Sequence, residues 1–354
     1  MNAVMRYLSR IRLFITRAHR IGIPTYRALL CELPCLIVWR TFNRLSSLLY
    51  SIIDQHRLAD KHTKQALNQL TKNDGTYFYI IVVPQVLHLL IPAVRLVQHH
   101  VRAIFILNGI SSAVRCALQT EFPEIPVLPR WTLPISCWPH GHLRSLLLRN
   151  SKRDFGILDH DFFLFDPSAI SKLTFKENEF AICVTSWRNS LTGIEFPGTH
   201  FLYLRASLLR DLMSQYKVGA HLYKKIPINV KPFLEEIGLS MDNPPKEYQS
   251  FFDSFLLLSA LAMHDGFKAR KLHIETSAWT HVGGTSMGIQ VTKDAVHHYV
   301  SSRFLELLAD AAISREYHRM LLAAPDRAQQ LRTALDPKIA ARVDKLIDRL
   351  ASAT

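Results

Sequence analysis

Residues 77–83 have the sequence Tyr77-Phe78-Tyr79-Ile80-Ile81-Val82-Val83, an uncharged run of aromatic and β-branched residues. A run of this length and composition is typical of a strand that is buried on both faces of a parallel sheet. A second run of this kind, at 101–107, ends at Asn108-Gly109, and a third, at 155–158, ends at Asp159-His160-Asp161. These three runs predict the centre of a sheet.

Helical patterns separate the strand runs, at residues 86–99, 112–121 and 140–150, and a further short strand is predicted at 125–128. Strands that alternate with helices indicate an α/β domain, here a Rossmann-like, mostly parallel sheet flanked by helices. In such sheets ligands bind at the carboxyl ends of the strands. We therefore expect Pro84, Asn108 and the segment Asp159-His160-Asp161 to line one crevice.

The chain divides into three predicted parts: a basic helical N-terminal region (1–72), a catalytic α/β domain (73–302) and a helical C-terminal extension (303–354). The turn Asn73-Asp74-Gly75 marks the first boundary. Regular alternation becomes weaker after residue 170, with strand-like runs at 180–185 and 200–205 and helical patterns at 206–216 and 248–264. In the C-terminal extension, Asp336-Pro337 has the residues of a helix start, an N-cap followed by proline.

The composition limits the class of protein. The 354 residues are 48% apolar and 20% charged, as in a globular protein, and the net charge of +14 predicts an anionic partner. The five cysteines lack the spacing of a metal site, which favours a reducing compartment. No uncharged apolar stretch is long enough to cross a membrane, so we expect a cytoplasmic protein.

The first fifty residues contain eight arginines and one acidic residue, Glu32. Apolar residues recur there at helical steps, which predicts a basic amphipathic helix. Such a helix, over residues 1–28, can lie on an anionic membrane, which would place the protein at the inner face. It can equally pack on the catalytic domain, and an organelle transit peptide has a similar composition.

Asp159 and Asp161 are two carboxylates in a strongly apolar stretch, and burying them without compensation would be unfavourable. In an extended segment they point to the same side, about 7 Å apart. A divalent cation can bridge that spacing, and Mn²⁺ or Mg²⁺ prefers carboxylate oxygens together with substrate phosphates. The alternative is a strand end whose aspartates cap a turn.

The order of these elements resembles the donor-binding half of GT-A glycosyltransferases, especially the bacterial family 2-like enzymes. The resemblance covers residues 77–290. It implies a GT-A-like fold and the metal-dependent transfer of a sugar from a UDP- or GDP-linked donor to a hydroxyl of a glycan or lipid-linked acceptor.

The resemblance also implies roles for individual residues. Asp159 would contact the donor ribose or a metal-bound water, and Asp161 would bind the metal. Pro84, Asn108 and Ser111 would lie near the nucleoside. The family usually has an acidic residue where Asn108 stands, which leaves the donor base open. His140, at the start of a helix, is a further candidate for the donor pocket.

Two later residues fit the same resemblance. Asp253, in an apolar helix predicted over 251–262, corresponds to the general base of inverting enzymes, although an aspartate there can also be only an N-cap. His281 stands close before Gly283-Gly284 and corresponds to a late histidine that binds the metal or the diphosphate. A structural histidine is the alternative.

Two other functions remain open. A sugar-phosphate nucleotidyltransferase would share the α/β topology and acidic metal ligands, but a glycine-rich basic loop is missing after the first strand run. A non-catalytic, basic protein that binds a membrane or nucleic acid would explain the charge. Because no nucleic-acid motif is recognisable, we expect no nucleic-acid partner.

Overall fold

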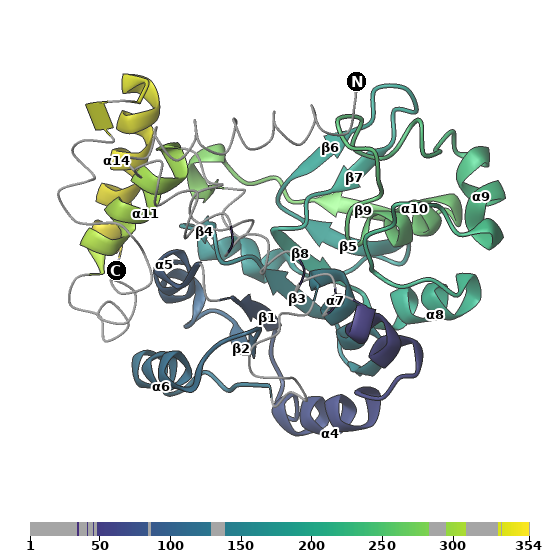
Figure 1. The fold of residues 1–354 in the computed structure, drawn as a ribbon, viewed down its shortest axis with the longest axis horizontal. Helices are drawn as coiled ribbons and strands as arrows, with labels where there is room; N and C mark the ends of the chain where they lie inside the picture. The colour runs from purple at the N-terminus through teal and green to yellow at the C-terminus, as the bar shows by residue number, and fades with distance from the viewer. Residues whose placement is uncertain are drawn as a thin grey trace.

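The computed structural model describes residues 34, 41, 45, 48–83, 86–128, 139–282, 295–308, 332–333 and 335–353. Its centre is a six-stranded sheet with the order β2-β1-β3-β8-β5-β9 (Figure 1). The six strands are β1 (Tyr77–Val82), β2 (Arg102–Leu107), β3 (Phe155–Leu158), β5 (Glu179–Cys183), β8 (Phe201–Leu204) and β9 (Lys268–Lys271). The mixed α/β fold predicted from the sequence is confirmed.

One strand runs against the others. β1 pairs in parallel with β2 and β3, and β5 pairs in parallel with β9. β8 is antiparallel to both of its neighbours, β3 and β5. The sheet is therefore mostly parallel, as predicted, but the residue that precedes β8 lies at the same edge as the residue that follows β3.

The core lies on both faces of the sheet. Tyr77, Tyr79 and Ile81 of β1 point into one apolar cluster, and Phe78 and Ile80 point into the other. The helices around the sheet are α4 (Asp60–Leu70), α5 (Leu87–Val97), α6 (Ser112–Glu121), α7 (His140–Asn150), α8 (Ala206–Tyr216), α9 (Lys231–Glu236) and α10 (Leu256–His264). Because both faces are covered, β1 is buried along its whole length.

Two short sheets lie beside the main one. β4 (Phe162–Leu164) pairs antiparallel with β10 (Trp279–His281), and β6 (Ser186–Arg188) pairs antiparallel with β7 (Glu195–Pro197). Within the described residues, short 3₁₀ turns span Pro167–Lys172, Ile228–Val230 and Thr276–Ala278. The first of these small sheets joins segments that are far apart in the sequence, which is essential to the site described below.

Two predicted elements were wrong in extent. The strand predicted at 125–128 is reduced to a single bridge between Phe105 and Val127. The helix predicted from 248, with residues 251–262 at its apolar centre, begins only at Leu256. Phe255 has a positive φ of 76°, which ends helical geometry on its N-terminal side, and Phe252 instead bridges to Tyr223.

The two ends of the chain are described only in part. Residues 48–55 and α4 are helical, as predicted, whereas the amphipathic helix predicted over 1–28 lies outside the described residues. At the other end, α11 (Ala295–Leu307) packs on α14 (Pro337–Ala353), and the Tyr299 hydroxyl donates to Asp344 over 2.6 Å (Figure 1). α11 runs across the predicted boundary at 302/303, and the division into domains stays a prediction.

The start of α14 is as the sequence predicts. The helix begins at Pro337, and the Asp336 Oδ1 atom accepts the N–H of Lys338 over 2.8 Å. Within the described part of the chain, the helices are all too short or too polar to cross a membrane.

Candidate active site

The aspartates predicted to bind a metal lie in a tight connection between β3 and β4. The Asp159 N–H donates to the His200 carbonyl over 2.8 Å, and the Asp159 carbonyl accepts the N–H of Phe162 over 3.2 Å. The Asp161 carbonyl accepts the N–H of Val282 over 3.1 Å. Neighbouring segments on two sides therefore fix the backbone that carries both carboxylates.

His281 joins these aspartates through the small sheet. In the pairing of β10 with β4, His281 stands opposite Phe162, the residue that directly follows Asp161 in the chain. Its Nε2 atom lies 3.4 Å from the Asp161 Oδ1 atom. Asp161 is buried, with 4% of its surface exposed, while the Asp159 side chain is 24% exposed. The structure thus brings together three residues that the sequence analysis assigned to the metal.

Arg144, which the sequence analysis missed, completes this group. It is 4% exposed, and its Nη2 atom lies 3.8 Å from the Asp159 Oδ1 atom. Its Nε atom is buried and has no hydrogen-bond partner within the described parts of the chain. A buried donor without a partner is unfavourable unless a ligand satisfies it. The position was detectable, because Arg144 stands one helical turn after His140 on α7.

His200 is the second residue that belongs to the group. Its ring stacks on that of His281, with centroids 3.8 Å apart, and its Nε2 atom lies 2.7 Å from the Thr185 Oγ1 atom. Burial, together with the charge of His281, lowers the pKa of His200 to about 3, so the ring is neutral at pH 7. Only the reversed direction of β8 places this residue beside Asp159.

Asp253, predicted as the general base, lies three residues before α10 and accepts two hydrogen bonds. Its Oδ2 atom is 2.8 Å from the Lys246 ammonium, and its Oδ1 atom accepts the N–H of Ser254 over 2.8 Å. Burial acts to raise the pKa of Asp253, but Lys246, the Ser254 N–H and Arg144 outweigh it and lower the pKa. The carboxylate is therefore held ionised by Lys246, while the predicted position at the start of a helix was wrong.

His140 lies within electrostatic reach of Asp253 and of Asp161. Burial lowers the pKa of this imidazole to about 3, aided by Arg144 and His160 and opposed by Asp161 and Asp253. His140 therefore stays neutral at pH 7.

The surroundings of Asp159 raise its pKa, whereas those of His140 lower the pKa of that imidazole. Burial and the charge of Asp161 raise the pKa of Asp159, and Arg144 and His281 counteract them. A carboxylate whose pKa is raised by a neighbouring carboxylate belongs to a site that a cation would stabilise.

The residues predicted near the nucleoside are less closely tied to this group. Asn108 is fully buried after β2, and its N–H donates to the Val82 carbonyl over 2.7 Å. Ser111 caps α6, its hydroxyl oxygen accepting the N–H of Val114 over 3.3 Å. Asn108 and Ser111 follow β2, which β1 separates from β3. Both residues therefore lie further along the edge of the sheet than Asp159, which follows β3. Pro84 lies outside the described residues.

Comparison with known proteins supports the class of enzyme. Residues 55–209, a little less than half of the chain, match the family model described as the StrH glycosyltransferase N-terminal domain. The matched segment contains Arg144, Asp159 and Asp161. The matched model is a glycosyltransferase domain, in agreement with the class of enzyme that the resemblance in the sequence implies.

Solved structures of low sequence identity also show similarity to this chain. The first is entitled "WbbM bifunctional glycosytransferase apo structure" (10% identity, TM-score 0.38), and the similarity covers 71% of this chain and 52% of that one. This chain therefore spans about half the length of that protein. The second is a 4-diphosphocytidyl-2C-methyl-D-erythritol synthase (14% identity, TM-score 0.27), with 48% and 87% covered. The curated proteins gave no match.

Proposed function

We propose that this protein transfers a sugar from a nucleoside-diphosphate donor, UDP- or GDP-linked, to a hydroxyl of a glycan or lipid-linked acceptor, and that Mn²⁺ or Mg²⁺ is required. The observation that carries the proposal is the meeting of Asp161 and His281, 3.4 Å apart, beside Asp159 and Arg144. The cytoplasmic location, and a peripheral membrane contact through residues 1–28, belong to the same proposal.

The side chains present fit a divalent metal. Asp159 and Asp161 offer carboxylate oxygens and His281 an imidazole nitrogen, a donor set suited to Mn²⁺ or Mg²⁺ when substrate phosphates complete the shell. When bound, the metal would neutralise negative charge that develops on the departing nucleoside diphosphate.

Arg144 supplies a second positive charge for that leaving group. It is buried beside Asp159, and its Nε–H is unused within the described structure. A planar guanidinium in a water-poor site binds phosphate oxygens strongly, and its fixed position avoids reorganisation during the reaction. Arg144 would therefore bind and orient the diphosphate.

Asp253 is the candidate that removes a proton from the acceptor. The acceptor oxygen would attack the anomeric carbon as the bond from that carbon to the diphosphate oxygen breaks, and the hydroxyl proton would pass to Asp253. Attack from the face opposite the leaving group inverts the anomeric configuration. Lys246 supports this role by keeping the carboxylate ionised.

Calorimetric titration with UDP and GDP, in Mn²⁺ or Mg²⁺ and in EDTA, tests the donor and metal assignments. We expect saturable binding only with metal, and loss of that binding in Asp161→Ala. Asp211→Ala, at an exposed position on α8, is the matched control and should bind as the wild type does. Equal affinity in EDTA, or in Asp161→Ala, would reject the metal site.

Assays with a panel of nucleotide sugars test the reaction itself. Release of a nucleoside diphosphate is expected for a glycosyltransferase, whereas consumption or release of pyrophosphate would indicate a nucleotidyltransferase. Asp253→Asn should bind the donor normally and lose turnover. Wild-type turnover in this variant would remove Asp253 as the base.

A further inference from the structure

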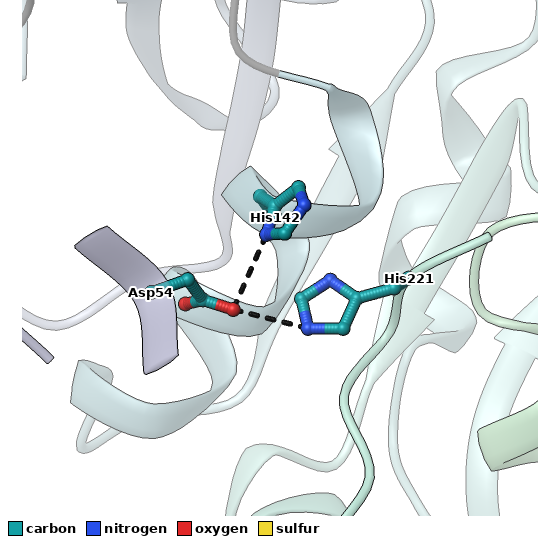
Figure 2. Close-up of side chains that lie close together, drawn as sticks. All are labelled: Asp54, His142 and His221. Atoms are coloured by element: carbon teal, nitrogen blue, oxygen red, sulfur yellow. Dashed lines mark hydrogen bonds and ion pairs between the residues drawn. The ribbon is translucent and has the colours of Figure 1, made fainter. Parts of the chain in front are cut away.

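A second group of potential metal ligands lies outside the candidate active site. The Asp54 Oδ2 atom is 3.3 Å from the His142 Nδ1 atom and 3.0 Å from the His221 Nε2 atom. Figure 2 shows both imidazole rings directing a nitrogen at this one carboxylate oxygen. The three residues come from separate parts of the fold: the helical segment 48–55, α7, and the loop after α8.

Two of the three separations between the ligand atoms are close to those found around a bound transition metal. The three ligand atoms all lie within 4.8 Å of one another. Zinc binds imidazole nitrogen and carboxylate oxygen at about 2.0–2.2 Å, so two ligands of a tetrahedral zinc lie about 3.3 Å apart. The two separations at Asp54 are close to that value. Small rearrangements would therefore suffice to admit the ion.

The second carboxylate oxygen of Asp54, Oδ1, accepts a hydrogen bond from an arginine. Arg149 donates to the Asp54 Oδ1 atom and also to both oxygens of Asp60, at 3.0 Å each. A carboxylate with one oxygen fixed by a donor and the other facing two imidazoles has the usual form of a metal ligand with its outer partner.

The orientation of the His221 ring is set by a contact with the Ser145 hydroxyl. The Ser145 hydroxyl donates to the Gly141 carbonyl over 2.9 Å and accepts the N–H of Ala220 over 2.8 Å. The His221 Nδ1 atom lies 3.5 Å from that hydroxyl oxygen. With its proton directed to Gly141, the hydroxyl can only accept from His221. Such a contact leaves the lone pair of the His221 Nε2 atom directed at Asp54, as metal binding requires.

An ion can reach the group from solvent. Asp54 and His221 line a cavity of about 840 Å³. Its wall also carries several cationic side chains: Arg57, Lys61, Lys64, Arg210 and Lys217. Water or a small anion from this cavity would complete the coordination shell.

We propose that Asp54, His142 and His221 bind one Zn²⁺ ion, which fastens the helical segment 48–55 to α7 and to the loop after α8. Two imidazoles and one carboxylate favour zinc over Mg²⁺ or Ca²⁺, which prefer oxygen ligands. The proposal does not depend on the proposed function, because it shares no ligand with Asp159, Asp161 and His281.

Titration of the chelator-treated full-length protein with ZnCl₂ tests the site. Asp161→Ala serves as the background, because it removes the other candidate metal site. We expect one Zn²⁺ per chain in this background, and at least 100-fold weaker binding when His142→Ala or His221→Ala is added. His99→Ala, an exposed histidine beyond the end of α5, is the control and should not change the affinity.

Absence of zinc binding in the background protein, or equal affinity after His142→Ala and His221→Ala, would overturn the proposal. Such a result would leave Asp54 as a hydrogen-bonded ion pair with the two histidines. X-ray absorption of the background protein with one equivalent of Zn²⁺ gives a second measurement, independent of the folding of the histidine variants. Scattering from two imidazole rings is expected, and a shell of oxygen alone would contradict the site.

Discussion

Asp161 and His281 lie 3.4 Å apart because β4 and β10 pair with Phe162 opposite His281. Asp161 lies on the connection between β3 and β4, whereas His281 lies much later in the chain, in β10. The pairing of β4 with β10 in the small two-stranded sheet sets their distance. The candidate active site is therefore built by two layers: the main sheet places Asp159, and the small sheet adds the histidine.

Arg144→Gln should weaken the binding of a nucleoside diphosphate. The buried guanidinium is the cation closest to Asp159 in the described site, and its loss removes charge that the phosphates need. We expect at least a tenfold loss of UDP or GDP affinity, about 1.4 kcal/mol, measured by calorimetry. Affinity for the uncharged nucleoside should not change. Arg115→Gln, exposed on α6, is the control, and an equal loss for nucleoside and diphosphate would contradict the assignment.

Lys246→Met should alter the pH dependence of turnover. Lys246 lowers the pKa of Asp253 through a 2.8 Å ion pair, so its removal raises that pKa. A base with a higher pKa loses its proton at higher pH, and the acidic limb of kcat/KM should move upward in pH. Profiles of wild type and Lys246→Met recorded from pH 4 to 8 would show the shift. An unchanged limb would mean that Asp253 is not the titrating base.

His264 should make the stability of the protein depend on pH. Hydrogen bonds to Glu236 and Asp265, at 2.9 Å each, raise the pKa of His264 above its ordinary 6.5. A raised pKa in the folded state stabilises the folded protein. This stabilisation is fully present at pH values below the pKa of the unfolded state, and it is lost as the pH rises through the pKa of the folded state. Because Glu236 is exposed, we expect less than about 1 kcal/mol.

Urea unfolding at pH 5.5 and 8.5 measures this effect of His264. The difference between the two pH values should be smaller in His264→Gln than in the wild type. His99→Gln, an exposed histidine, should retain the wild-type difference. An identical pH dependence in wild type and His264→Gln would show that the contacts with Glu236 and Asp265 do not stabilise the fold.

Gly156→Ala should destabilise the central sheet. Gly156 stands opposite Phe78 in the pairing of β3 with β1, and a Cβ atom there would lie 2.2 Å from the Phe78 ring. Overpacking of this kind costs about 1–3 kcal/mol, measured by denaturant unfolding. Adding Phe78→Leu makes room and should recover part of the loss relative to Phe78→Leu alone. Strictly additive losses would place the strain elsewhere.

Sequence patterns predicted the elements with strong local character. The helices predicted at 112–121, 140–150 and 206–216 have these bounds in the structure. A local side-chain cap, Ser111, fixes the start of the first one. The strand at 125–128 was overestimated because its only described partner in the structure is Phe105, a matter of tertiary pairing rather than of local pattern.

The candidate site was predictable where residues directly follow a strand. The apolar surroundings of Asp159 and Asp161 favoured them as candidate metal ligands, an assignment that stays a prediction. His200 could not be assigned in this way, because the direction of β8, which brings this residue beside Asp159, depends on packing between distant segments. The second cluster, at Asp54, joins three regions with no shared sequence pattern, so only the folded chain brings it into view.

The late position of β10 in the chain has a consequence for shortened forms of this protein. A fragment that ends with the matched segment at residue 209 would retain both aspartates and Arg144, yet lack His281 and Asp253. Under the proposed function, such a fragment would keep two of the three proposed metal ligands and would lack the proposed base. Truncation anywhere before β10 would therefore remove His281 from the proposed metal ligands.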